Sequence, residues 1–176
     1  MKKTIAIICT ILLFSCAAGS KEISIFFTPS AECENNIVRL INKSETTIDA
    51  AVYAINNEQI VKALKEASRR GVEIRILTDR LQASNRSSKV RELYDCGINI
   101  RVHSKYKIEH NKFAVFDKQT ASSGSYNWTN PASSKNSENC IFFNRNKEAV
   151  KEYLDRFEYL WKINTQEKSD EWFERL

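Results

Sequence analysis

The sequence predicts one α/β domain in which helices flank a mixed β-sheet. Apolar, β-branched runs alternate along the chain with segments whose apolar residues recur every three or four positions, a pattern typical of strands alternating with helices. The length of 176 residues fits a single domain, and glycine and proline are scarce, at 4 and 2 residues. This composition excludes a disordered or a loop-rich chain.

The strands are predicted from short apolar runs. Residues 21–27 (KEISIFF) alternate and then become apolar, which favours a first strand. Residues 47–55 (TIDAAVYAI) are mostly apolar and β-branched, which favours a strand buried on both faces. Further strands are expected at residues 72–78, 98–102, 111–116, just before Gly124 and at 140–143. No internal repeat of the kind found in solenoid proteins is present.

Helical spacing of apolar residues predicts the helices between these strands. The segments are residues 31–43, the stretch after Asn57 that ends at Gly71, residues 87–94 and residues 148–161. Asn57 is the expected N-cap of the second helix, and Gly71 its C-terminal stop. The polar tail from Asn164 is expected to fray.

The beginning of the chain is typical of an export signal. Lys2 and Lys3 precede an apolar run at residues 4–14 that is too short to span a bilayer as a mature helix. Residues 13–16 (LFSC) also resemble a bacterial lipobox, in which Cys16 would carry lipid, and ordinary cleavage near residue 18 or 19 is the alternative. We expect residues 1–19 to be a signal peptide and residues 20–176 to form an exported domain, periplasmic or secreted, that is anchored to a membrane only if Cys16 is lipidated.

The remaining cysteines do not predict a metal site. Cys33, Cys96 and Cys140 are odd in number, so at most one disulfide and one free thiol can form, and we favour buried, unpaired cysteines. Their spacing fits no zinc motif, and the chain has only two histidines. We therefore expect no metal and no cofactor.

Positive charge gathers in the middle of the chain. The formal net charge is +5, and residues 69–112 hold 11 Lys or Arg against 5 Asp or Glu. Such a segment can face a polyanion or can form a solvated helix face.

The pattern H-x-K occurs twice, at residues 103–105 and 110–112. Asp117 and then Gly124-Ser125-Tyr126-Asn127 follow the second copy, which gives H-x-K-x4-D-x6-G-S-x-N. This arrangement resembles the signature of the phospholipase D superfamily. The region from about residue 23 to 163 resembles the short, single-motif exported endonucleases of bacteria. The spacing does not fit from His103, which we expect to be a loop residue whose replacement by alanine leaves most activity in place.

The residue types of the second copy suit a phosphate group. His110 and Lys112 have the same parity at the start of the expected strand, so both side chains should point to one face. A neutral imidazole can attack phosphorus and form a phosphohistidine, and lysine is a compact cation for the nonbridging oxygens. Ser125 and Asn127 can donate to the same oxygens, and Gly124 allows close approach of the backbone.

The resemblance supplies two further roles. It places a buried acid at Glu138, which we expect to hold the attacking imidazole in one tautomer, as the carboxylate of a catalytic triad does. Asp117 ends the expected strand and is interpreted as structural support of the motif. Metal-independent hydrolysis is the activity that the resemblance implies.

One motif does not complete the reaction. The attack needs a nucleophile, and the departing alkoxide needs an acid. Either His103 is that acid, or a second chain brings its own His110, and the resemblance favours a homodimer with the active site across a two-fold axis. For the substrate we favour DNA or RNA cut without sequence preference. Phospholipid head groups are the alternative, and an inactive nucleic-acid-binding protein is least favoured.

Overall fold

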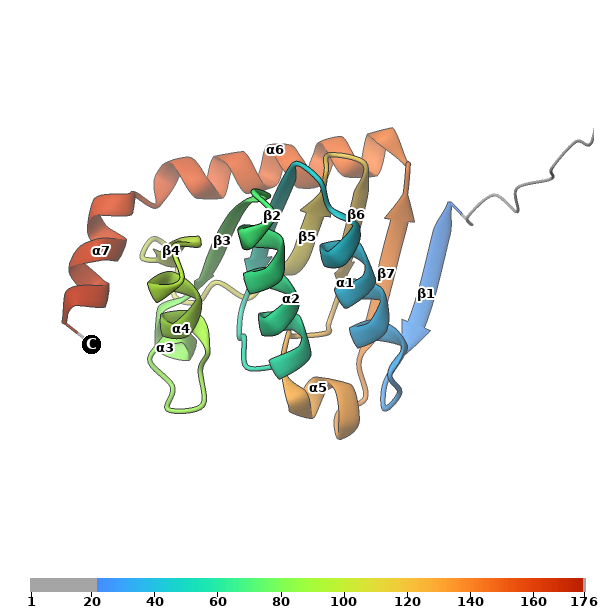
Figure 1. Ribbon diagram of the computed structural model, residues 1–176, viewed down its shortest axis with the longest axis horizontal. Helices are drawn as coiled ribbons and strands as arrows, with labels where there is room; N and C mark the ends of the chain where they lie inside the picture. The colour runs from blue at the N-terminus through green and yellow to red at the C-terminus, as the bar shows by residue number, and fades with distance from the viewer. Residues whose placement is uncertain (1–21, 176) are drawn as a thin grey trace, which may run out of the picture.

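A mixed β-sheet forms the centre of the protein, of which the computed structural model describes residues 22–175. The strands are β1 (Ile23–Phe27), β2 (Thr47–Val52), β3 (Glu73–Asp79), β4 (Asn99–His103), β5 (Lys112–Phe116), β6 (Thr120–Gly124) and β7 (Asn139–Asn144). They are ordered β1-β7-β6-β5-β2-β3-β4 in one sheet (Figure 1). β2, β3 and β4 are parallel, whereas all other neighbouring pairs are antiparallel. The predicted fold class, a mixed sheet flanked by helices, is confirmed.

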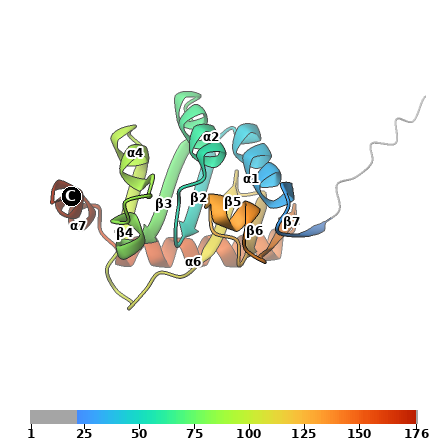
Figure 2. The same ribbon diagram turned by 90° about the horizontal axis from the view of Figure 1, so that it is seen from below.

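Helices cover both faces of this sheet. They are α1 (Glu32–Lys43), α2 (Glu58–Arg69), α3 (Arg80–Ala83), α4 (Val90–Asp95), α5 (Asn130–Ser134), α6 (Lys147–Ile163) and α7 (Gln166–Glu174). α1, α2 and α4 lie on one face, and α6 crosses the other (Figure 2). The central strand β2 sends Ile48 and Ala50 into the core beneath α1 and α2, and Ala51 into the cluster with Phe157 of α6. β2 is therefore buried on both faces, as its sequence predicts.

Local sequence signals explain how α2 begins and ends. The side chain of Asn57 accepts a hydrogen bond from the backbone N–H of Ile60 at 3.0 Å, which makes it the N-cap. Gly71 follows the helix with φ of +90°, a conformation that glycine adopts without strain. The expected strand at residues 47–55 ends at Val52, and the short helices α3 and α5 were not expected.

The C-terminal tail does not fray, contrary to the expectation from its polar sequence. α7 begins after the Thr165 N-cap and buries Phe173, which is 2% exposed. The Ser169 hydroxyl accepts a hydrogen bond from the backbone N–H of Val102 in β4 at 3.1 Å. Because β4 is an edge strand, this contact satisfies a backbone group that would otherwise face solvent.

The preference for unpaired cysteines was wrong. Cys33 of α1 and Cys140 of β7 form a disulfide, although they are 107 positions apart in sequence. Both lie in the core that α1 builds against the sheet, so the fold rather than the spacing brings them together. Cys96 is the free cysteine of the described residues, and it is exposed.

The expected signal peptide, with Cys16, lies outside the described residues. Within residues 22–175, no helix combines the length and the apolar character that crossing a bilayer requires.

Candidate active site

The residues of the second H-x-K motif gather at one end of the sheet. β2 and β6 end there, and β5 and β7 begin there (Figure 1). Lys112 is the first residue of β5 and pairs with Val52, the last residue of β2. Gly124 ends β6 and pairs with Cys140 near the start of β7. The two halves of the motif are adjacent because β5 pairs with β6, although Lys112 and Gly124 are twelve positions apart in sequence.

His110, Lys112 and Tyr53 form the centre of the site. His110 is exposed and precedes β5 rather than lying within it. The ring of Tyr53 lies edge-on to the His110 ring, with 4.6 Å between the centroids, and 4.8 Å from the Lys112 Nζ. The Nζ also donates a hydrogen bond to the carbonyl oxygen of His110 at 2.6 Å. The imidazole and the ammonium are therefore held beside one aromatic ring.

Lys112 is a lysine with an altered protonation equilibrium. Burial lowers its pKa from the usual 10.5 to about 8, and the carboxylates of Glu138 and Glu109 act in the opposite direction. A half-buried cation that stays mostly charged at neutral pH suits the binding of a phosphate oxygen.

Gly124 allows two strands to approach closely at the site. Its φ is +134°, and a Cβ built on it would lie 2.3 Å from the backbone carbonyl oxygen of Asn139. The same oxygen accepts hydrogen bonds from the backbone N–H groups of Ser125 and Tyr126 at 3.1 and 3.2 Å. Glycine is thus required here by both backbone conformation and space.

Glu138 binds Ser125 rather than His110 within this chain. The Ser125 hydroxyl donates to Glu138 Oε2 at 2.5 Å, and the Asn136 amide donates to Oε1 at 2.9 Å. Glu138 is half-buried. Its expected role as the group that orients the imidazole therefore stays a prediction, as does a phosphate contact by Ser125. Asn127 lies in the segment after β6, and its Oδ1 is buried without a hydrogen-bond partner among the described residues.

Asp117 lies at the other end of β5. Its carboxylate accepts hydrogen bonds from the backbone N–H groups of Glu45, Thr46 and Thr47 at 2.8–3.2 Å. Partial burial tends to raise its pKa, but these hydrogen bonds outweigh that effect and hold the pKa below the usual value. Asp117 joins the turn before β2 to the end of β5, which fits the expected structural role.

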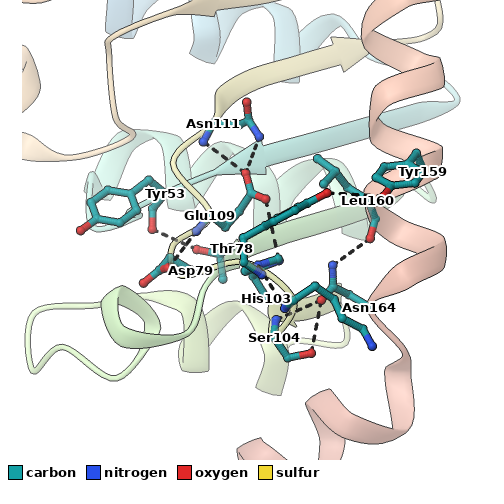
Figure 3. Close-up of polar contacts among 12 residues, drawn as sticks. Tyr53, Thr78, Asp79, His103, Ser104, Glu109, Asn111, Tyr159, Leu160 and Asn164 are labelled. Carbon is teal, nitrogen blue, oxygen red and sulfur yellow. Dashed lines mark hydrogen bonds and ion pairs between the residues drawn. The ribbon is translucent and has the colours of Figure 1, made fainter.

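A buried polar cluster holds the segment that carries His110 (Figure 3). Glu109 is 1% exposed; its backbone N–H donates to Asp79 Oδ2 at 3.0 Å, and its Oε1 accepts from the Asn111 side chain at 2.5 Å. Glu109 Oε2 lies 3.9 Å from His103 Nδ1. The residues on both sides of His110 are therefore fixed by two carboxylates, those of Asp79 and Glu109, while His110 itself stays exposed.

His103 is not the loop residue that was expected. It ends β4, pairs with Asp79 of β3 and is 3% exposed. Its Nε2 accepts hydrogen bonds from the backbone N–H groups of Lys105 and Tyr106. Burial lowers the pKa of His103, although Glu109 and Asp79 oppose that shift. A buried imidazole whose Nε2 accepts from the backbone is unsuited to protonate a leaving group.

Tyr53 and Glu109 belong to the site, although neither is part of the H-x-K motif. Tyr53 is the first residue after a strand buried on both faces, a position where side chains often reach a site. Glu109 is the one acidic residue between Arg101 and Lys112 and directly precedes His110. Within residues 22–175, no three His, Cys, Asp or Glu side chains are placed to hold a metal ion.

Comparisons with known protein sequences identify a family for most of this chain. The family model described as "Cardiolipin synthase, PLD-like domain" matches residues 37–161. A phospholipase D of Rickettsia prowazekii is 36% identical over 135 residues, which make up 77% of this chain and 65% of the relative. The human mitochondrial cardiolipin hydrolase is 29% identical over 127 residues, or 72% of this chain and 50% of the relative. The matched part of the chain thus spans half to just under two thirds of these relatives.

Solved structures share the fold. Nuc from Salmonella typhimurium, described as a phospholipase D family member, superimposes with a TM-score of 0.77 at 26% identity, covering 81% of this chain and 95% of that one. NucT from Helicobacter pylori has a TM-score of 0.74 at 20% identity, with coverages of 81% and 97%. The region that the family model matches, residues 37–161, covers most of the chain, and residues 110–127 lie within it. This protein therefore belongs to the phospholipase D superfamily.

Proposed function

We propose that this protein is a phosphodiesterase that acts through a phosphohistidine at His110, and that nucleic acid is its substrate. The observation that carries the proposal is the exposed His110 imidazole beside the half-buried Lys112 ammonium. Both lie at the end of the sheet where Ser125 and Asn127 follow β6. An anionic diester meets a cation and a nucleophile at the same place.

The reaction proceeds in two displacements. An imidazole nitrogen of His110 attacks phosphorus, the P–N bond forms, and the bond to the leaving oxygen breaks as that oxygen takes a proton from an acid. Water then attacks phosphorus, the conjugate base of that acid takes a proton from the water, and the P–N bond breaks. Lys112 binds nonbridging oxygens throughout.

A second copy of the chain supplies the acid in this proposal. His103 is buried and accepts hydrogen bonds from the backbone, so His110 of a partner is the remaining imidazole. Tyr106 and Ile108 line the same hollow as His110, Tyr159 of α6 contacts the Tyr106 hydroxyl at 3.4 Å, and all three are large and 45–49% exposed. A two-fold contact through this surface would cover apolar area and bring two sites together.

Basic residues near the site support nucleic acid as the substrate. Lys105 and Lys107 are exposed on the segment that leads to His110, and Arg156 of α6 borders the same hollow as His110. Arg86 is exposed in the loop after α3. These cations can contact phosphates on either side of the one that is cleaved.

A phospholipid is the second candidate substrate. Relatives carry the names phospholipase D and mitochondrial cardiolipin hydrolase, and the exposed Tyr106 and Ile108 near His110 could also face lipid.

Two substrates in one buffer distinguish these functions. Plasmid DNA and vesicles of phosphatidylcholine with cardiolipin are each incubated with the protein in EDTA. Nicking of DNA that is lost in His110→Ala and Lys112→Ala, and kept in Lys118→Ala at the far end of β5, is the expected result. Release of head groups or glycerophospholipid without nicking would contradict the proposal.

Mixed dimers test the shared site. Wild-type chains and His110→Ala chains with different affinity tags are mixed, and the heterodimer is isolated. We expect the heterodimer to lose multiple-turnover hydrolysis, because it has one His110 instead of two. Full activity per heterodimer would show that each chain works alone.

We also propose that the protein is exported. A disulfide is typical of proteins that fold in an oxidising compartment. Fractionation of cells that express the full chain should place it in the periplasm or medium, or in a membrane fraction that Cys16→Ala releases.

A further inference from the structure

We infer that a polar pocket beside Tyr53 holds the base of the nucleoside adjacent to the cleaved phosphate. The inference rests on the proposed function and deepens it, because it assigns the part of the substrate that the motif does not bind.

The pocket has a volume of about 240 Å³ and lies between the end of β2, the α3 region and the segment after β6. Tyr53 and Asn56 line it from the first, Gln82 and Asn85 from the second, and Asn127 from the third. Pockets for drug-sized ligands measure about 300–1,000 Å³, so this one fits a single base or sugar.

Tyr53 connects the pocket to the reacting groups. Its ring contacts both His110 and Lys112, and the same side chain forms one wall of the pocket. Gln82 fixes this ring, since its Nε2 donates to the Tyr53 hydroxyl at 2.9 Å. A group in the pocket is therefore one side chain away from a phosphate at His110.

Unused hydrogen-bonding capacity marks the pocket as a binding site. Asn127 Oδ1 is buried and lacks a hydrogen-bond partner among residues 22–175. Buried polar atoms in native proteins nearly always have a partner, so a donor from a ligand would complete this one. The Gln82 amide, whose nitrogen binds Tyr53, retains its oxygen as a second acceptor.

The chemistry of the walls selects a neutral, flat, hydrogen-bonding group. The lining side chains are amides, hydroxyls, small apolar groups and one aromatic ring, and none of them is charged. Nucleobases present neutral donors and acceptors on their edges and a face that stacks on aromatic rings. A cationic choline or ethanolamine head group would find no carboxylate here.

Small phosphodiesters that share p-nitrophenol as the leaving group test this inference. The substrates are thymidine 5′-(p-nitrophenyl phosphate), thymidine 3′-(p-nitrophenyl phosphate), methyl p-nitrophenyl phosphate and glycerol p-nitrophenyl phosphate. We expect kcat/KM for at least one thymidine ester to exceed that for the methyl ester by about tenfold, the scale of one stacked base. Gln82→Leu should lower this ratio about fivefold, whereas Gln119→Leu, in the turn at the far end of the sheet, should not.

Three other results would contradict the assignment of this pocket to a nucleobase. Equal kcat/KM for thymidine and methyl esters in wild-type protein overturns the nucleoside site and leaves the phosphodiesterase function intact. A preference for the glycerol ester that Gln82→Leu removes would assign the pocket to a lipid head group instead. If no ester is hydrolysed in a manner that depends on His110, the proposed function itself fails. The wild-type comparison does not depend on how the variants fold.

Discussion

The protonation of Lys112 should set the upper pH limit of the reaction. Its pKa is about 8 because burial disfavours the charged form, and the carboxylates of Glu138 and Glu109 only partly offset this effect. A group with this pKa is roughly 90% charged at pH 7 and roughly 10% charged at pH 9. If phosphate binding needs the charged form, kcat/KM should fall about ninefold between these two pH values.

The assay is the hydrolysis of methyl p-nitrophenyl phosphate in EDTA between pH 6 and 10. We expect the basic limb to be centred near pH 8 in wild-type protein. Lys112→Arg should lose activity, because a guanidinium does not replace a compact ammonium, but its residual rate should not fall between pH 7 and 9. Lys105→Arg, in the other H-x-K pair, is the matched control and should keep the wild-type limb. A limb that persists near pH 8 in Lys112→Arg would assign it to another group and refute the reasoning.

Three further predictions concern stability. Burial lowers the pKa of His103 from 6.5, so the folded state binds a proton at this residue less readily than the unfolded state does. The free energy of unfolding should therefore decline as the pH drops below 6.5. In urea unfolding, His103→Ala should show a flatter decline. Reduction of Cys33–Cys140, which are 107 residues apart, should lower the free energy of unfolding by roughly 2–5 kcal/mol, whereas Cys96→Ser should behave as wild type; equal urea midpoints with and without reductant would contradict this. Gly124→Ala places a Cβ 2.3 Å from a backbone carbonyl oxygen at a residue with φ of +134°. The substitution should lower the free energy of unfolding by about 1–3 kcal/mol and should also lower kcat/KM. An unchanged melting temperature would show that the strands can move apart.

Much of the fold follows from local sequence, because helices and central strands have strong periodic signals. The N-cap Asn57 and the stop at Gly71 were predictable, since their effects act over one helical turn. The motif from His110 to Asn127 was predictable as a unit, because its spacing is recognisable without knowledge of the fold.

Contacts between distant segments could not be predicted in the same way. The disulfide joins residues that share no local pattern, and the order of α7 depends on its packing against β4. His103 was assigned to a loop because a single histidine between two strands has no periodic signal. Its burial results from Asp79 and Glu109, which the fold brings to it from β3 and from the segment before His110.

Glu138 has one role that the resemblance implies and one contact that the structure shows. The resemblance makes it a partner of His110, which stays a prediction, and within one chain its carboxylate accepts a hydrogen bond from the Ser125 hydroxyl. One chain can therefore organise the serine side of the site by itself.

The spacing of the motif can also be understood as a measure of length. The four residues between Lys112 and Asp117 form the outward strand of a β-hairpin, and the six between Asp117 and Gly124 contain the turn and nearly all of the returning strand. Each residue of a strand advances the chain by about 3.3 Å and turns the next side chain to the opposite face. A single insertion in either strand would therefore displace Ser125 from the end of the sheet where Lys112 lies, or turn its side chain to the opposite face. The intervals of the signature therefore correspond to the lengths of β5, of the turn and of β6.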